Sequence, residues 1–287
     1  MLAIIIDGKE VASKVKERVK EAVKILKDNG IEPCLATVLA SDDPASATYV
    51  RMKKNACKEV GIKTIDHEPK NYTNEQMIEL VTILNEDPKV HGILIQLPLP
   101  NNMNEFLITG SIKPNKDVDG LTPFNVGMLA YDQGMLKPCT PAGIMELLRY
   151  YNISVEGKDV VIINRSMLVG KPLAFLMLNN NATVTICHSK TKDLIDKCKN
   201  ADILVTAVGN GKFRVTKDMV KDQAVVIDVA TVRIDNKLRG DVEFDEVKDK
   251  ASYITPVPGG VGPMTVAMLL RNTALAAGLN NGIDIRL

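Results

Sequence analysis

Residues 159–188 read DVVIINRSMLVGKPLAFLMLNNNATVTICH, and this stretch decides the fold class. Its two apolar runs, Asp159–Asn164 and Thr183–His188, predict buried strands. The segment between them, from about Pro172 to Asn180, predicts a helix. Continuous apolar strands joined by a helix are typical of an α/β protein whose parallel sheet is covered on both faces.

The same alternation of strand and helix runs through most of the chain. One helix has apolar residues at helical spacing and stops at Gly30, and another opens with a capping box made by Thr73 and Gln76. The expected helices are Lys9–Lys27, Pro44–Val60, one from Thr73, Leu194–Asn200 and one from Pro263 to about Ala277. The further expected strands are Leu35–Ala40, Lys63–His67, His91–Leu97, Ile203–Val208, Ala224–Val229 and Tyr253–Val257.

One stretch, Ile112–Pro141, interrupts this rhythm with four prolines and predicts loops and a hinge. The length of 287 residues also favours two domains. We therefore expect an N-terminal α/β domain of residues 1–137, against which residues 272–287 pack, and a C-terminal parallel-sheet domain of residues 138–271.

Composition excludes several classes of protein. A formal net charge of +1 gives no field that would attract nucleic acid, and no run of about 20 apolar residues could span a membrane. The apolar run at the N-terminus is too short for a signal peptide. Five cysteines without a CxxC pair fit reduced thiols. The chain also has no HExxH motif, which argues against a catalytic metal. We expect a cytoplasmic protein with no metal, no nucleic-acid partner and no membrane partner.

The C-terminal half is typical of dinucleotide binding, although it has no GxGxxG motif. The turn Arg165–Pro172 meets Gly170 at a helix start, where backbone N–H groups can hold a pyrophosphate. After the next strand, His188–Lys192 lacks the acid that would hold a ribose 2′-hydroxyl and offers Ser189 among basic residues. With Arg165 this suits a 2′-phosphate. An ordinary strand-to-helix turn and a solvated basic loop are the plainer alternatives.

In the N-terminal half, Tyr49 and Lys53 share one face of a predicted helix. Lys53 could transfer protons and Tyr49 could stack on a ligand, but an ordinary helix surface has the same spacing. Gln96, at a strand end before a Pro-rich turn, is either a fixed hydrogen-bond donor or a strand cap. Asp117 and Asp119 either bind a substrate amine or make an Asx turn.

The string Thr255–Thr265, TPVPGGVGPMT, has three prolines and three glycines between a predicted strand and a helix. Such a loop allows a flat ligand to approach the backbone closely, and the helix N-terminus behind it favours a carboxylate or phosphate. A structural turn needs fewer special residues, so a ligand-binding loop is the favoured interpretation.

Five strings together resemble the bifunctional methylenetetrahydrofolate dehydrogenase/cyclohydrolase family, in order and over nearly the whole chain. They are Tyr49–Lys53 (YVRMK), Gly92–Pro100 (GILIQLPLP), Lys116–Thr122 (KDVDGLT), Pro138–Pro141 (PCTP) and Thr255–Thr265. The resemblance implies a folate-binding catalytic domain followed by a Rossmann-like NADP domain, with the final helix returning to the first domain. It also implies oxidation of 5,10-methylenetetrahydrofolate with NADP, hydrolysis of the methenyl product to 10-formyltetrahydrofolate, and a homodimer.

Roles for single residues follow from the same resemblance. Lys53 would be the central acid/base with Gln96 assisting, Tyr49 would stack on the folate, and Asp119 would hydrogen-bond the pterin. The rest of the implied substrate site is Leu97, Pro98, Pro258, Gly259 and Gly260. The implied cofactor site is Asn164, Arg165, Ser166, Gly170, Ser189, Val208, Gly209 and Thr231.

Three positions depart from the family pattern, all in the cofactor half. Asn164 stands where Gly is common, Ala230-Thr231-Val232 replaces a triplet such as Gly-Ile-Asn, and Val208–Gly211 replaces a Gly-x-Pro turn. An enzyme with only one of the two activities is therefore one alternative. A different NADP oxidoreductase, acting on a small hydroxy or keto acid, and a non-catalytic folate- or nucleotide-binding regulator are the others.

Overall fold

The structure is a computed structural model that describes residues 2–235 and 237–287. The chain divides into two compact units, each with its own parallel sheet. The six-stranded unit comprises the chain up to Ala12 and Thr140–Thr265, and the three-stranded unit comprises Ser13–Cys139 and Val266–Leu287. The expected α/β class is confirmed, as is the return of the last helix to the N-terminal part of the chain.

The six-stranded sheet has the order β1-β11-β8-β7-β5-β6, and every neighbouring pair is parallel. Its strands are β1 (Ile4–Ile5), β5 (Asp159–Ile163), β6 (Thr183–Cys187), β7 (Ile203–Thr206), β8 (Val225–Asp228) and β11 (Tyr253–Ile254). The first strand of the chain thus joins the sheet of the C-terminal half.

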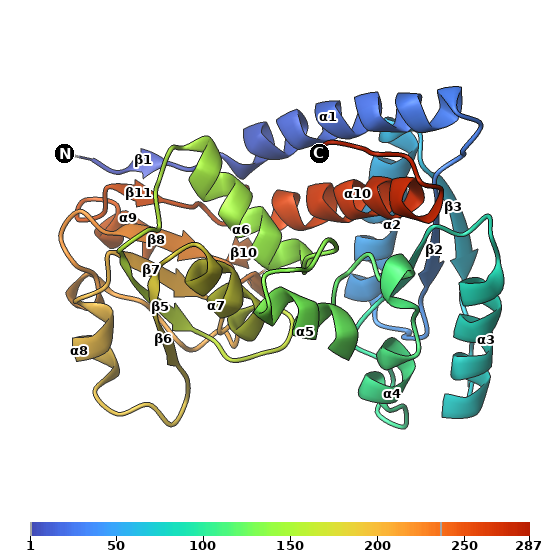
Figure 1. Cartoon of the computed structure of the whole chain (residues 1–287). Helices are drawn as coiled ribbons and strands as arrows, with labels where there is room; N and C mark the ends of the chain where they lie inside the picture. The colour runs from blue at the N-terminus through green and yellow to red at the C-terminus, as the bar shows by residue number, and fades with distance from the viewer. Residues whose placement is uncertain (1, 236) are drawn as a thin grey trace. The chain divides into compact units, whose positions relative to one another are not determined.

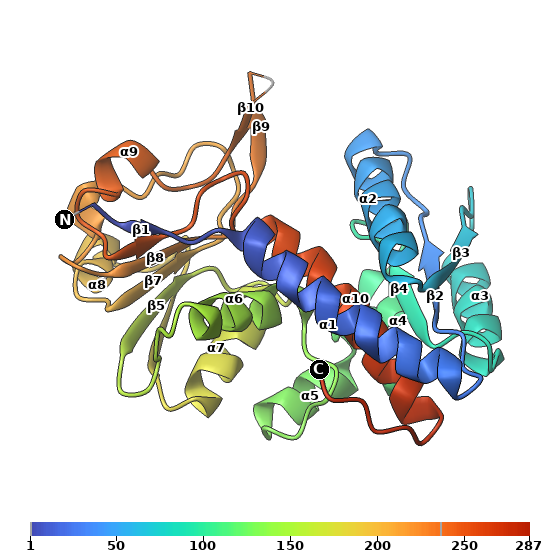
Figure 2. The same cartoon turned by 90° about the horizontal axis from the view of Figure 1, so that it is seen from above.

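Helices cover both faces of this sheet, as its continuous apolar strands require. Figure 2 shows α6 (Cys139–Tyr150) and α7 (Gly170–Asn179) on one face, with α8 (Leu194–Cys198) and α9 (Phe244–Val247) on the other. On the α8 and α9 face, Val161 and Leu204 pack with Val247 in one apolar core. A short 3₁₀ helix η2 (Lys217–Met219) and the antiparallel hairpin β9 (Val232–Ile234) and β10 (Lys237–Arg239) complete this unit.

The three-stranded sheet has the order β3-β2-β4 and is also parallel. Its strands are β2 (Cys34–Val38), β3 (Lys63–His67) and β4 (Gly92–Ile95). The first four helices along the chain are α1 (Gly8–Asp28), α2 (Pro44–Val60), α3 (Asn74–Glu86) and α4 (Glu105–Gly110). The predicted capping box is confirmed, because Gln76 N–H donates to the Thr73 hydroxyl and Thr73 N–H donates to the Gln76 side chain.

Helix α10 (Val261–Asn280) begins two residues before the predicted start at Pro263. A proline is tolerated there because the first-turn N–H groups of a helix have no partner within the helix. From Val266 onward α10 belongs to the three-stranded unit, where it lies beside the C-terminal part of α1 (Figure 1, Figure 2). Asn280, the last residue of α10, hydrogen-bonds to Asn115.

The stretch Ile112–Pro141, expected to be loops and a hinge, is partly helical. It contains the 3₁₀ helix η1 (Pro114–Lys116), α5 (Pro123–Ala130) and the start of α6. Thr122 caps α5 by accepting a hydrogen bond from Asn125 N–H, and Pro123 occupies the first helical position. Pro123 thus marks the start of a helix, whereas the sequence analysis interpreted it as part of a loop.

Among the helices that the structure describes, none combines the length and the apolar character that crossing a membrane requires.

Candidate active site

Lys53 and Gln96, 43 residues apart in sequence, meet at the carboxyl edge of the three-stranded sheet. The Lys53 Nζ on α2 donates a hydrogen bond of 3.0 Å to Gln96 Oε1. Lys53 is only 9% exposed, which is unusual for a lysine and keeps its amine at one place. Gln96 is oriented in turn by its Nε2, which donates to the Leu97 carbonyl at 2.7 Å. Of the two interpretations of Lys53, the exposed helix surface is wrong.

Backbone pairing decides this meeting. Gln96 N–H donates to the Val38 carbonyl at 2.9 Å, which carries the pairing of β4 with β2 one residue beyond the end of the strand. Helix α2 follows β2, so its second turn lies above the same sheet edge. Tyr49, one turn before Lys53 on α2, is 47% exposed and leaves its ring face available to a flat ligand.

The two aspartates of the Lys116–Thr122 loop have different surroundings. Asp117 is fully buried, and its carboxylate accepts hydrogen bonds from Gly120 N–H, Thr122 N–H and the Asn125 amide, so it builds the turn. Asp119 is half-buried, and burial raises its pKa while the charge of Lys53 opposes that rise. The charge of Lys53 therefore acts on the Asp119 carboxyl.

Asn272 and Cys139, which the sequence interpretation did not single out, hold the Asp119 segment. The Asn272 amide donates to the carbonyls of Val118 and Lys137, each at 2.8 Å, and the Cys139 thiol donates to the Val118 carbonyl at 3.3 Å. Asn272 is fully buried, and its Oδ1 atom has no hydrogen-bond partner in the described chain. The sequence offered little signal for Asn272, because it stands between two other polar residues, Arg271 and Thr273.

In the six-stranded unit, the predicted cofactor residues follow the carboxyl ends of β5, β6, β7 and β8. This is the edge at which ligands bind in open parallel sheets. The β5–β6 register pairs Ile163 with Cys187, so Arg165 and Ser189 stand two residues beyond a paired position on adjacent strands. Both are exposed. A guanidinium and a hydroxyl that follow adjacent strands at one sheet edge are the kinds of group that bind a phosphate.

The turn after β5 depends on Asn164. Its Oδ1 accepts from Ser166 N–H and Ser166 Oγ at 2.7 Å and from Gly170 N–H at 3.0 Å, while its Nδ2 donates to the Ala207 carbonyl. A side chain at position 170 would overlap the Asn164 carbonyl, so the turn requires glycine there. The amide of Asn164 is thus hydrogen-bonded within the protein, where it shapes the turn.

The loop that begins at Thr255 is tightly folded within the six-stranded unit. Gly260 N–H donates to the Pro256 carbonyl and Gly8 N–H donates to the Gly259 carbonyl, both at 2.9 Å. Gly259 has a φ of +108°, a conformation that favours glycine. A Cβ at Gly260 would lie 2.6 Å from the Pro256 oxygen. These two glycines therefore have structural reasons as well as the predicted functional one.

Sequence comparison places this geometry in a family. The model of the tetrahydrofolate dehydrogenase/cyclohydrolase catalytic domain matches residues 6–119, and the model of the NAD(P)-binding domain of that family matches residues 138–281. The chain belongs to this family. The predicted family and the NAD(P)-binding character of the C-terminal half are thereby confirmed.

Relatives and solved structures of the family cover nearly all of the chain. The bifunctional protein FolD of Nitrosopumilus maritimus is 57% identical over 97% of this chain and 98% of its own length. That of Cenarchaeum symbiosum is 59% identical over 97% of this chain and 99% of its own length. The crystal structure of the bifunctional enzyme FolD from Campylobacter jejuni superposes with a TM-score of 0.94 at 49% identity, covering 96% of this chain and 99% of that one.

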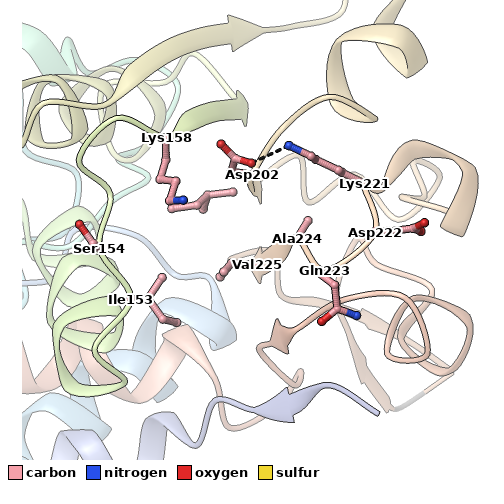
Figure 3. Close-up of a pocket in the computed structure, with 10 residues that line it drawn as sticks. Ile153, Ser154, Lys158, Asp202, Lys221, Asp222, Gln223, Ala224 and Val225 are labelled. Atoms are coloured by element: carbon pink, nitrogen blue, oxygen red, sulfur yellow. Dashed lines mark hydrogen bonds and ion pairs between the residues drawn. The ribbon is translucent and has the colours of Figure 1, made fainter. Parts of the chain in front are cut away.

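The six-stranded unit contains a hollow of about 160 Å³ (Figure 3). Lys158, Asp202 and Ala224 line it, and each precedes a strand, so the hollow lies at the amino edge of the sheet. The Lys221 amine pairs with Asp202 at 2.7 Å and lowers the pKa of that carboxyl. No predicted site residue lines this hollow. Within residues 2–235 and 237–287, no group of three His, Cys, Asp or Glu side chains could hold a metal ion.

Proposed function

We propose that this chain oxidises 5,10-methylenetetrahydrofolate with NADP and hydrolyses the resulting methenyl compound to 10-formyltetrahydrofolate. The observation that carries the proposal is the buried Lys53–Gln96 pair at 3.0 Å, with Asp119 within electrostatic reach. A buried amine held by a neutral amide is suited to moving protons at one substrate carbon.

The residues of the three-stranded unit act on the folate. Tyr49 stacks on its flat ring system, with Leu97 and Pro98 beside it, and Asp119 accepts hydrogen bonds from the pterin. Bound NADP supplies the hydride acceptor for the methylene carbon. When water adds to the methenyl carbon, Lys53 removes a proton from that water, and the bond from the carbon to one folate nitrogen breaks as the nitrogen takes a proton. Pro258, Gly259 and Gly260, which belong to the six-stranded unit, are proposed as further substrate-binding residues.

Preference for NADP over NAD is the finer part of the proposal. It is supported by Arg165 and Ser189, which follow the ends of the adjacent strands β5 and β6, and by the absence of an acid in residues 188–192. The Trypanosoma brucei enzyme of the family, 39% identical with a TM-score of 0.91 over 98% of this chain and 99% of that one, was solved with NADP cofactor and an inhibitor. Ser166, Gly170, Val208, Gly209 and Thr231 would complete the cofactor site around Asn164.

We also propose a homodimer and a cytoplasmic location. The first is implied by the family resemblance, and light scattering at twice the chain mass of 31.3 kDa would support it. The second is supported by five buried free cysteines, because thiols persist in a reducing compartment.

The test is a spectrophotometric assay with 5,10-methylenetetrahydrofolate and NADP or NAD, and a separate assay with methenyltetrahydrofolate. Reduction of cofactor and hydrolysis are both expected, with NADP preferred. Hydrolysis without reduction would indicate a cyclohydrolase alone, and inactivity in both assays would contradict the proposal.

The Lys53→Met variant is expected to hydrolyse methenyltetrahydrofolate at least about a hundredfold more slowly while still binding folate. The substitution removes the proton-transfer group but keeps a side chain of similar volume. Lys54→Met is the matched control, since Lys54 lies next to Lys53 and pairs with Asp66 at 2.7 Å. Hydrolysis at the wild-type rate in Lys53→Met would remove Lys53 from its proposed role.

A further inference from the structure

Asp241 is a fully buried carboxylate that holds the loop after β7. Its Oδ2 accepts hydrogen bonds from the Thr206 hydroxyl and from Val208 N–H, both at 2.7 Å, and its Oδ1 accepts from Gly209 N–H at 3.0 Å. The donors thus come from the last residue of β7 and from the two loop residues of the proposed cofactor site.

A second buried carboxylate, Asp228, holds the backbone on which Asp241 stands. Asp228 ends β8, and its Oδ1 accepts from Ala230 N–H and Asp241 N–H at 3.1 Å. Its Oδ2 accepts from Val242 N–H at 2.8 Å. The loop after β8 and the segment 241–242 are therefore tied to one carboxylate.

Asn164 extends this connection to β5, because its Nδ2 donates to the Ala207 carbonyl at 2.6 Å while its Oδ1 orders the turn to α7. We call Asn164, Asp228 and Asp241 the polar frame. It links the carboxyl ends of β5, β7 and β8 by hydrogen bonds at the edge where the dinucleotide is proposed to bind.

Neither carboxylate of the polar frame takes part in an ion pair that the described chain shows, so each is stabilised by N–H and O–H donors. Burying a carboxylate without a cation is costly, and a turn with no ligand to place can be built from neutral side chains. The frame also constrains its surroundings, since a Cβ at Gly240 would overlap Asp228 Oδ2. Two costly buried carboxylates at the sheet edge where a ligand is predicted to bind indicate that the loops there must be held in one conformation.

The direction of the peptide groups shows what the loop offers to a ligand. In a planar trans peptide the carbonyl points opposite to the N–H that follows it. Gly209 N–H points at Asp241, so the Val208 carbonyl points away from the frame. The Ala207 carbonyl, in contrast, is taken by Asn164. The loop therefore presents an acceptor at Val208, which suits an amide N–H₂ group.

We propose that Asp241 is a positioning residue for the dinucleotide. It holds the loop so that the Val208 carbonyl accepts a hydrogen bond from the carboxamide of the nicotinamide ring. This deepens the proposed function and rests on it. Hydrolysis of the methenyl compound uses residues of the three-stranded unit and does not depend on Asp241.

The test measures binding of NADPH by its own fluorescence, which is simple because the chain contains no tryptophan. In the wild type both oxygens of Asp241 accept from backbone N–H groups. In Asp241→Asn an amide N–H₂ replaces one of these oxygens and cannot accept, so the loop is no longer held, and we expect the Kd for NADPH to rise about tenfold or more. Methenyl hydrolysis should stay within about twofold of wild type. Asp245→Asn, which removes a negative charge at an exposed site in α9, is the matched control and should change neither.

A second measurement distinguishes orientation of the Val208 carbonyl from a general loss of order in the loop. The 3-acetylpyridine analogue of NADP lacks the amide N–H₂, so it should compete more weakly than NADP for wild-type protein, and Asp241→Asn should lose most of that difference. Thr206→Val, which removes one O–H donor and leaves the backbone donors in place, should give a smaller effect in the same direction.

An unchanged Kd in folded Asp241→Asn would overturn the inference. An equal fall of NADPH binding and hydrolysis would overturn it as well, because the effect would then be a general loss of structure. If Asp241→Asn does not fold, Thr206→Val becomes the test: the Kd for NADPH should still rise while hydrolysis stays within about twofold of wild type, and an unchanged Kd would overturn the inference. Absence of NADPH binding by the wild type would instead refute the proposed function.

Discussion

Arg165 and Ser189 are the two exposed side chains on which the preference for NADP is proposed to depend. Arg165→Ala is expected to raise the Michaelis constant for NADP about tenfold or more and to leave that for NAD nearly unchanged, because the lost charge-assisted bonds reach only the 2′-phosphate. Initial rates with both cofactors measure this. Lys158→Ala, at the amino end of β5, controls for the lost charge. Equal changes for both cofactors would contradict the assignment.

Asp228 links stability to pH through its raised pKa. Burial raises its pKa to about 6 from an ordinary value of 3.8, the nearby Asp241 adds to the rise, and the backbone N–H bonds oppose it. The folded protein then binds more protons than the unfolded chain between these two values. The stability that this group contributes is therefore full below pH 3.8 and is lost as the pH rises through about 6.

Urea unfolding between pH 4 and 6 tests this linkage by its slope. The free energy of unfolding of the wild type should fall with pH more steeply than that of Asp228→Asn, by up to about 1.4 kcal/mol per pH unit. Comparing slopes removes any constant destabilisation of the variant. Parallel slopes would show that Asp228 has an ordinary pKa.

At the scale of elements, the connections between strand and helix carry the tightest constraints. Gly240, which follows β10, has no room for a side chain, because a Cβ would overlap the Asp228 carboxylate. Gly240→Ala is expected to lower the free energy of unfolding by about 2 kcal/mol, since either the loop or the carboxylate must move.

Gly127 in α5 is the opposite case and the natural control, because nothing lies within 4 Å of a Cβ placed there. Gly127→Ala should raise the free energy of unfolding by about 0.5–1 kcal/mol, through lower entropy of the unfolded chain. Denaturant titration of both variants measures the pair. Equal effects would mean that close approach at Gly240 is unimportant.

At the scale of the whole molecule, the five free cysteines report on folding because all of them are buried. Burial raises the pKa of Cys34 to about 11 and those of Cys57 and Cys198 to about 12, and it also raises those of Cys139 and Cys187. The reactive thiolate is therefore scarce in the folded protein at neutral pH.

A thiol reagent such as a disulfide dye is expected to label the folded protein only slowly and to label all five sites quickly in denaturant. Cys34, Cys57 and Cys139 belong to the three-stranded unit and Cys187 and Cys198 to the other, so mass spectrometry of labelled peptides follows the unfolding of each unit separately. Rapid labelling without denaturant would contradict the burial.

The sequence predicted the fold class well, because apolar strands and amphipathic helices are local patterns. The parallel strands, the long helices and the capping box at Thr73 follow from residues a few positions apart. The helices α4, α5, α6 and α9 and the two-residue strand β1 were missed. Most of these elements are short and give little periodicity, and the prolines at the starts of α5 and α6 also signal loops. Family membership was likewise recognisable, because each string of the resemblance is contiguous.

By itself, then, the sequence determined the α/β class, the two parallel sheets and the family of this protein. Only the tertiary structure decided that Lys53 meets Gln96, that Asp117 builds a turn while Asp119 is half-buried, and that Asp241 is bound to the loop at Val208. The physical reason is that these contacts join residues brought together by strand register and burial. Neither spacing nor composition encodes which of several similar polar side chains loses its water and finds a partner.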